Sequence, residues 1–169
     1  MELIIPTMEH KDAALAFRQE HIDHGEHSIH GGSGLADART YEAWLKKNED
    51  LAARIPSEQL VRSTLYFGME GGVIVGILQI RHNLNQFLRD TYGNIGYNVR
   101  PTERRKGYAT RMLALALEQC RILGLDKVLI SCSKTNEASA KTITKNGGVQ
   151  TREFTEADGR VVQQYWITL

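Results

Sequence analysis

The stretch Val99–Met112, VRPTERRKGYATRM, places three cationic side chains in a row just before an expected helix. These are residues 104–106, and the small residues Gly107 and Ala109 follow. The first N–H groups of a helix have no partners inside it, and the peptide dipoles make that end partly positive. Cations there are unfavourable unless an anion offsets them, so the stretch predicts a phosphate or pyrophosphate site. On spacing alone, a solvated basic loop before a helix is the alternative.

The segments on both sides of this stretch predict a strand–helix–strand unit. Apolar residues recur at spacings of three and four over 107–123, as on one face of a helix, and Gly124 suits its C-terminal cap. The β-rich run 94–99 ends before Pro101, which cannot donate to a ladder. The mainly apolar run 127–132 reads as a strand buried on both faces. A helical crossover joins parallel strands, so these two strands are predicted to run parallel.

The rest of the chain predicts further helices and strands but no repeat or linker. A glycine- and histidine-rich segment, 24–35, reads as a long loop, and Gly71-Gly72 reads as a hairpin turn. The remaining predicted elements are strand 3–5, helices 8–22 and 40–54, strands 63–69 and 73–80, helix 136–147, and strands 149–154 and 161–168. The sequence therefore predicts one α/β domain over 1–169, with a central mixed, largely antiparallel sheet flanked by helices.

Composition narrows the function classes. The chain has 169 residues, a net charge of +1, 41% hydrophobic and 24% charged residues, so no strongly basic balance favours nucleic acid. No apolar run approaches the roughly 20 residues that span a bilayer, and no signal peptide is visible. We therefore expect a cytoplasmic protein with no membrane or nucleic-acid partner. Cys120 and Cys132 fall within apolar patterns and are interpreted as buried thiols rather than a disulfide or metal pair.

The phosphate site has no common nucleotide-binding motif. Neither GxxxxGK[ST] nor GxGxxG occurs in the chain. The segment RRKGYA instead resembles the [R/Q]-x-x-G-x-[G/A] signature of the GNAT family of N-acetyltransferases, with Arg104, Gly107 and Ala109 in the fixed positions. The similarity extends in order over 94–148, to an Asn-x-x-Ser that opens a short helix. The resemblance implies a GNAT-like acyl-CoA N-acyltransferase fold, in which the two predicted parallel strands splay apart.

The resemblance also implies acetyl-CoA as co-substrate, with no metal. The pyrophosphate would lie on the backbone N–H groups of residues 105–110, and the pantetheine arm would pair with strand residues 97–99. Asn136 matches an asparagine that contacts the cofactor in many members, and an N-cap is an equal alternative for it. The implied cofactor-binding residues are Tyr97, Asn98, Val99, Arg104, Arg105, Lys106, Gly107, Tyr108, Ala109, Thr110, Asn136 and Ser139.

The implied reaction is transfer of the acetyl group to a primary amine by direct attack in a ternary complex. A backbone N–H near Val99 would stabilise the oxyanion. Many members use a tyrosine as general acid at the position of Ile143, and some use a glutamate base at the position of Gly93 or Ser131. Because none of these side chains can do so here, the acid and base stay unassigned. The candidates are Tyr97, Tyr92 and His82.

The histidine-rich segment 21–30 lies where the resemblance places acceptor-binding elements. Glu26, His27 and His30 are its candidate acceptor contacts, while a solvated loop or a metal site are the alternatives. Asp23 and Asp37, with Glu26, would attract a cationic acceptor. The expected partner is a small-molecule, aminoacyl or peptide amine, and the resemblance also allows a homodimer. A non-catalytic acyl-CoA sensor or scaffold of the same fold is the alternative function.

Overall fold

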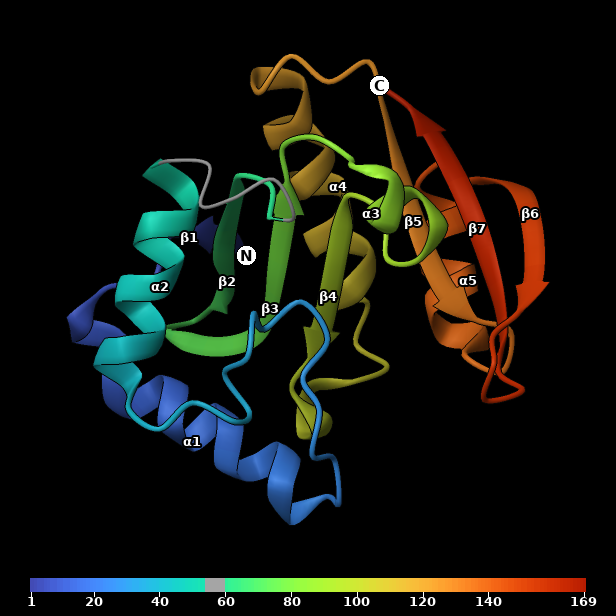
Figure 1. The fold of residues 1–169 in the computed structure, drawn as a ribbon. Helices are drawn as coiled ribbons and strands as arrows, with labels where there is room; N and C mark the ends of the chain where they lie inside the picture. Colours follow the sequence, from blue (N-terminus) through green and yellow to red (C-terminus); the bar gives the residue numbers. More distant parts are fainter. Residues whose placement is uncertain (54–59) are drawn as a thin grey trace.

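The computed structural model describes residues 1–53 and 60–169, and Figure 1 shows two groups of strands with helices packed around them. The predicted fold class is confirmed, since antiparallel sheets are flanked by helices. The elements in chain order are β1 (Glu2–Ile4), the 3₁₀ turn η1 (Met8–His10), α1 (Lys11–Asp23), α2 (Tyr41–Ala53), β2 (Ser63–Glu70), β3 (Val73–Arg81), α3 (Gln86–Asp90), β4 (Ile95–Val99), η2 (Pro101–Glu103), α4 (Tyr108–Ile122), β5 (Lys127–Ser133), α5 (Glu137–Lys145), β6 (Val149–Thr155) and β7 (Val161–Thr168).

Most predicted elements are present within a few residues of their expected bounds. The first predicted helix is divided into η1 and α1. The last residue of the predicted helix 40–54 lies outside the described residues, and α2 ends at Ala53. Sequence reasoning missed α3, a single turn capped by the Asn85 side chain, which accepts a hydrogen bond from Leu88 N–H at 2.9 Å. A five-residue helix is too short to show an apolar periodicity.

Hydrogen bonding divides the strands into two sheets rather than one central sheet. The first has the order β1-β2-β3-β4 and the second β5-β7-β6, and every neighbouring pair within them is antiparallel. The arrows of β4 and β5 point the same way in Figure 1, as the helical crossover through α4 requires. One isolated bridge, of antiparallel type, joins Gly93 to Ile130. The strands β4 and β5 are thus splayed apart, as expected, and they do not pair with each other in one sheet.

Asn94 holds the two sheets together at the closed end of this gap. Its backbone N–H donates to Leu129 O at 2.6 Å, and its side-chain carbonyl accepts from Leu129 N–H at 2.9 Å. Its side-chain amide donates to Arg81 O on β3 at 3.1 Å. Before it, Gly93 has φ +72°, and a Cβ there would lie 2.2 Å from Leu129 O. The sheets therefore meet at residues 93–94 and diverge beyond them.

Two apolar cores cover opposite faces of the first sheet. Helices α1 and α2 pack on one face, around Phe17, Trp44 and Phe67. The apolar stripe of α4 packs on the other face and continues to β5 and β7. Both cysteines are buried and free, as expected. Within the described residues, no helix has the length and apolar character needed to cross a membrane.

Candidate functional site

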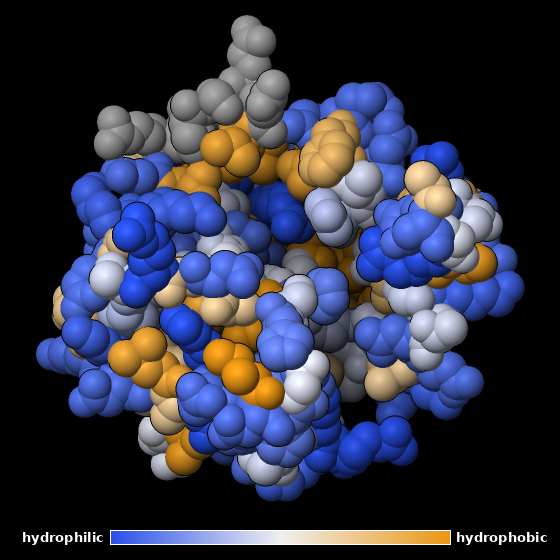
Figure 2. Space-filling view, turned by 60° about the horizontal axis from the view of Figure 1, so that its bottom comes forward, coloured by the Kyte–Doolittle hydropathy of each residue, from blue (hydrophilic) through white to orange (hydrophobic). Residues whose placement is uncertain are grey.

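The gap between β4 and β5 opens into a cavity of about 880 Å³, here named the first cavity. The signature loop before α4, the strand β4 and the start of α5 form its walls, and the loop after α1 reaches its rim. Figure 2 shows the molecule with the lower end of Figure 1 turned forward, and this face is largely hydrophilic and hollowed near its centre. The predicted residues that line it are Glu26, His27, His30, Tyr97, Asn98, Val99, Arg104, Arg105, Gly107, Tyr108, Ala109, Thr110, Asn136 and Ser139.

The signature loop presents unpaired backbone donors to the first cavity. Arg105 and Gly107 have positive φ values of +66° and +83°, and α4 begins directly after them. Arg111 is the first residue of this helix whose N–H donates to a backbone carbonyl, that of Gly107, at 3.2 Å. In the described structure the N–H groups of residues 105–110 therefore have no protein acceptor. Turned amides at a helix start form a concave anion site.

The three cationic side chains of the signature have different roles. Arg104 forms a bidentate ion pair with Glu26, and its Nε donates to Val99 O at 3.1 Å. Lys106 pairs with Glu103 at 2.9 Å, and it does not line the cavity. Arg105 is exposed, and no ion pair holds it within the described chain. Arg105 is thus the cation of this loop that is free to meet an anion.

The open edge of β4 offers backbone groups to the same cavity. Arg100 N–H donates to Val75 O at 2.8 Å. In an antiparallel pair every second residue bonds to the partner strand, so the residues two and four positions before Arg100 also direct their backbone groups to β3. Asn98 is one of them, and its N–H and C=O are used inside the sheet. Tyr97 and Val99 face the gap instead. Of the predicted residues 97–99, Tyr97 and Val99 thus direct backbone groups into the gap, and Asn98 also lines the cavity.

The start of α5 forms the wall opposite β4. Asn136 is the N-cap of this helix, since its side chain accepts from Ser139 N–H at 3.1 Å. The Ser139 hydroxyl lies 2.9 Å from the Tyr97 hydroxyl, which joins β4 to α5. The N-cap role that the sequence allowed for Asn136 is confirmed, and Asn136 also lines the first cavity. Ile143, one turn further, is fully buried, so this position supplies no proton donor.

A second cavity of about 490 Å³ lies next to the first. The two share five lining residues, which are Ser28, His30, Tyr97, Asn136 and Ser139. The second cavity extends over β5, Tyr92 and the turn between β6 and β7. Tyr97 therefore stands where the two cavities meet, and burial raises its pKa to about 12, so its hydroxyl keeps its proton at neutral pH.

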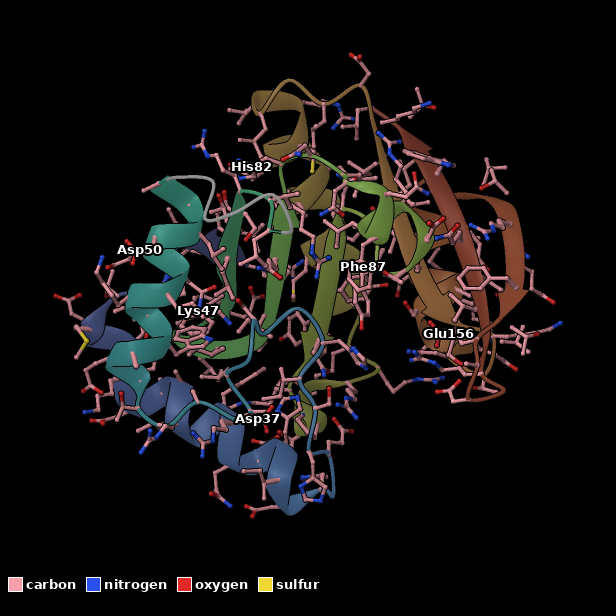
Figure 3. All side chains as sticks on the ribbon, viewed as in Figure 1. Asp37, Lys47, Asp50, His82, Phe87 and Glu156 are labelled. Atoms are coloured by element: carbon pink, nitrogen blue, oxygen red, sulfur yellow. The ribbon has the colours of Figure 1, made fainter. Side chains whose placement is uncertain are left out.

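The other two candidate catalytic residues lie in different places. Tyr92 lines the second cavity and is half exposed, with its ring 5.8 Å from that of Phe87. His82 lines neither cavity. Its Nε2 lies 2.8 Å from Thr64 Oγ1, and burial lowers its pKa. Figure 3 shows His82 just beyond the end of β3. The structure thus brings Tyr97 and Tyr92 to the site and leaves His82 outside it.

The histidine-rich segment crosses in front of β4. Gly31 packs so closely on the strand that a Cβ there would lie 2.2 Å from Gly96 O. His21 and His24 direct Nδ1 to carbonyls of α1, at 2.9 and 2.8 Å, while His27 and His30 line the first cavity. No group of three metal-ligating side chains forms among the residues described.

A family model described as Acetyltransferase (GNAT) domain matches residues 2–149. The chain belongs to the GNAT acetyltransferase family. Its members use acetyl-CoA, which agrees with the row of free amides in the first cavity. No curated protein sequence matches the chain significantly.

Solved structures with this GNAT fold include several acetyltransferases. A RimL ribosomal L7/L12 alpha-N-protein acetyltransferase in complex with coenzyme A has a TM-score of 0.75 and 16% identity, over 99% of this chain and 93% of that one. Spermidine N-acetyltransferase SpeG from Vibrio cholerae has a TM-score of 0.69 and 12% identity, over 99% of this chain and 95% of that one. The putative acetyltransferase yncA from Salmonella typhimurium, with its cofactor acetyl-CoA, has a TM-score of 0.68 and 15% identity, over 99% of this chain and 93% of that one. At such identities the likeness concerns the fold.

Several residues of this GNAT site escaped sequence reasoning, and Asn94 and Arg81 show why. Asn94 hydrogen-bonds to both sheets, and Arg81 lines the second cavity from the end of β3. Asn94 opens a predicted strand, and nothing in its neighbours shows that its side chain bonds to two other strands. Arg81 follows an apolar run, where a cation usually marks the strand's exit to solvent. Neither residue belongs to a local motif that could have identified it.

Proposed function

We propose that this protein transfers an acetyl group from acetyl-CoA to a primary amine by direct attack in a ternary complex. One observation carries the proposal: the two cavities meet at Tyr97, and one of them is lined by unpaired amides. Two substrates can therefore enter separately and meet inside the protein. The acceptor is a small molecule or an aminoacyl or peptide amine, as the size of the second cavity allows.

The first cavity suits each part of coenzyme A. The N–H groups of residues 105–110 would hold the pyrophosphate, and Arg105 would add a cation beside it. The open backbone edge of β4 at Tyr97 would pair with the amides of the pantetheine arm, as an added strand does. Lys145 also lines this cavity, and no ion pair holds it among the described residues, so it can meet a further phosphate.

The meeting point of the cavities supplies the groups that the reaction needs. Acetyl-CoA brings an activated thioester. The Val99 N–H faces the gap and would donate to the oxygen that becomes negative during attack. Tyr97 keeps its proton at neutral pH and would give it to the departing thiolate. Among the described residues, His30 is the histidine that lines both cavities, and an imidazole is a common proton acceptor.

A thiol-release assay with acetyl-CoA and a panel of primary amines tests the proposal. We expect amine-dependent release of free coenzyme A and a mass gain of one acetyl group on the amine. Calorimetry with coenzyme A, run in parallel, separates the alternative function. Tight binding of coenzyme A without turnover of any amine would favour the non-catalytic sensor or scaffold and refute the transferase.

A further inference from the structure

The second cavity contains an arginine whose charge no carboxylate of the described residues balances. Among these residues, three charged side chains line this cavity, namely Arg81, Glu156 and Arg160. Glu156 and Arg160 neutralise each other, since Arg160 Nε donates to the Glu156 carboxylate at 2.7 Å. Figure 3 shows Glu156 at the turn between β6 and β7, on the far side from β3. Within residues 1–53 and 60–169, no carboxylate pairs with Arg81.

The environment of Arg81 leaves most of its donors free. Its Nη1 donates to Gly93 O at 3.0 Å, and its guanidinium lies 5.7 Å from the centre of the Tyr92 ring. The remaining guanidinium donors have no partner within the described chain. Burial lowers the pKa of Arg81, because it removes water that would stabilise the charged guanidinium. An arginine fixed in a cavity with free donors is suited to a carboxylate or a similar oxyanion.

We propose that the acceptor is a small amine that also carries a carboxylate or similar oxyanion, which binds Arg81 in the second cavity. This inference rests on the proposed acetyl transfer and names the class of its acceptor. The anion would replace the water that Arg81 loses on burial, and the amine would then lie towards Tyr97, where the cavities meet. Arg81 is a substrate-binding residue in this proposal and does not take part in proton transfer.

The positive charge of Arg81 disfavours the cationic acceptor that the acidic residues of the loop predicted. Glu26 is paired with Arg104 and so has no free charge to offer. Asp37 lines neither cavity, and Figure 3 places it above α1. A polyamine in the second cavity would bring further positive charge to Arg81, which is repulsive in a partly desolvated site. The structure therefore favours amino acids over polyamines.

Pairs of acceptors that differ only in charge test the proposal on the unmodified protein. Thiol release is measured with a set of amino acids, with the carboxamide of each, and with spermidine. We expect kcat/KM for the preferred amino acid to exceed that for its carboxamide by about tenfold or more, which is the usual value of a charge-assisted contact. Equal rates for the acid and the amide, or a preference for spermidine, would overturn the proposal and leave acetyl transfer intact.

Variants at Arg81 then locate the contact. Arg81→Gln should raise KM for the amino acid about tenfold or more, with a smaller change in kcat and no change for the carboxamide. Arg81→Lys should recover part of the loss, and Arg121→Gln, on the exposed face of α4, should match the unmodified protein. An unchanged KM in Arg81→Gln would overturn the assignment. Absence of turnover with every amine would refute acetyl transfer itself, and this inference with it.

Discussion

The two cavities on either side of Tyr97 are built in different ways. The first takes its decisive groups from one short segment, the backbone of residues 105–110, with the edge of β4 beside it. The second takes side chains from the ends of β3 and β5, the loop after α1, and the turn between β6 and β7. One binding surface is therefore a property of local backbone conformation, and the other depends on how distant segments pack.

This difference agrees with what each cavity is expected to bind. Backbone amides and a helix terminus recognise phosphate whatever the side chains around them. Side chains from separate segments can change without altering the fold, so they determine which amine enters. We therefore expect substitutions in the first cavity to affect coenzyme A binding, and substitutions in the second to affect the acceptor alone. Four predictions test this separation, starting from the largest effect.

Gly107→Glu should weaken coenzyme A binding by roughly 100-fold or more. Gly107 has φ +83°, which a glutamate adopts only with strain, and the new carboxylate would face the phosphates. Isothermal titration calorimetry measures the change. Gly72→Glu is the matched control, because Gly72 has φ +79° in the turn between β2 and β3, away from both cavities. Equal losses of affinity in the two variants would show that backbone strain, not the phosphate site, is responsible.

Tyr97→Phe should lower kcat by about 100-fold while leaving coenzyme A affinity nearly unchanged, because the ring stays packed and only the proton donor is lost. With a pKa of about 12, the Tyr97 hydroxyl is protonated at neutral pH, and its role as acid is lost only as the pH rises towards that value. Steady-state kinetics across pH measure this. Tyr66→Phe, in the same core but lining neither cavity, is the control. A kcat in Tyr97→Phe equal to that of Tyr66→Phe would exclude the acid role.

Asn94→Ala should lower the free energy of unfolding by roughly 2–4 kcal/mol, because it leaves Arg81 O and Leu129 N–H without their side-chain partners. It should also weaken the binding of both substrates by a few fold, since both cavities depend on how the two sheets are held together. Urea unfolding and calorimetry measure the two effects. Asn83→Ala, at an exposed position, should change neither. A selective loss of one substrate would contradict the shared role.

Glu26→Gln should give the smallest effect, a two- to fivefold tighter binding of coenzyme A at about the same stability. The change removes a negative charge from the first cavity and releases Arg104. Hydrogen bonding from Arg104 lowers the pKa of Glu26 below 4.5, so the stability that the ion pair provides at neutral pH is lost as the pH falls through that lowered value. Glu118→Gln, exposed on α4, controls for net charge. Weaker binding in Glu26→Gln would mean that the ion pair organises the loop.

The sequence by itself determined the first cavity and the class of fold. Gly107 and Ala109 lie within one turn of chain, and the family signature that they match implied free amides at this helix start. The periodicity of α4 and the apolar run of β5 identified the crossover, because a 3.6-residue repeat and a short continuous apolar run are visible along the chain.

Only the tertiary structure decided which side chains surround the acceptor. Arg81 and Glu156 are 75 positions apart, and Asn94 bonds to Leu129 across 35 positions. No local pattern records such long-range neighbours, because the packing of the two sheets brings these residues to the same site. The ion pair of Arg104 with Glu26, across 78 positions, is likewise a long-range contact that the signature by itself does not show. Short-range spacing determines backbone geometry, whereas long-range packing determines which charges remain free.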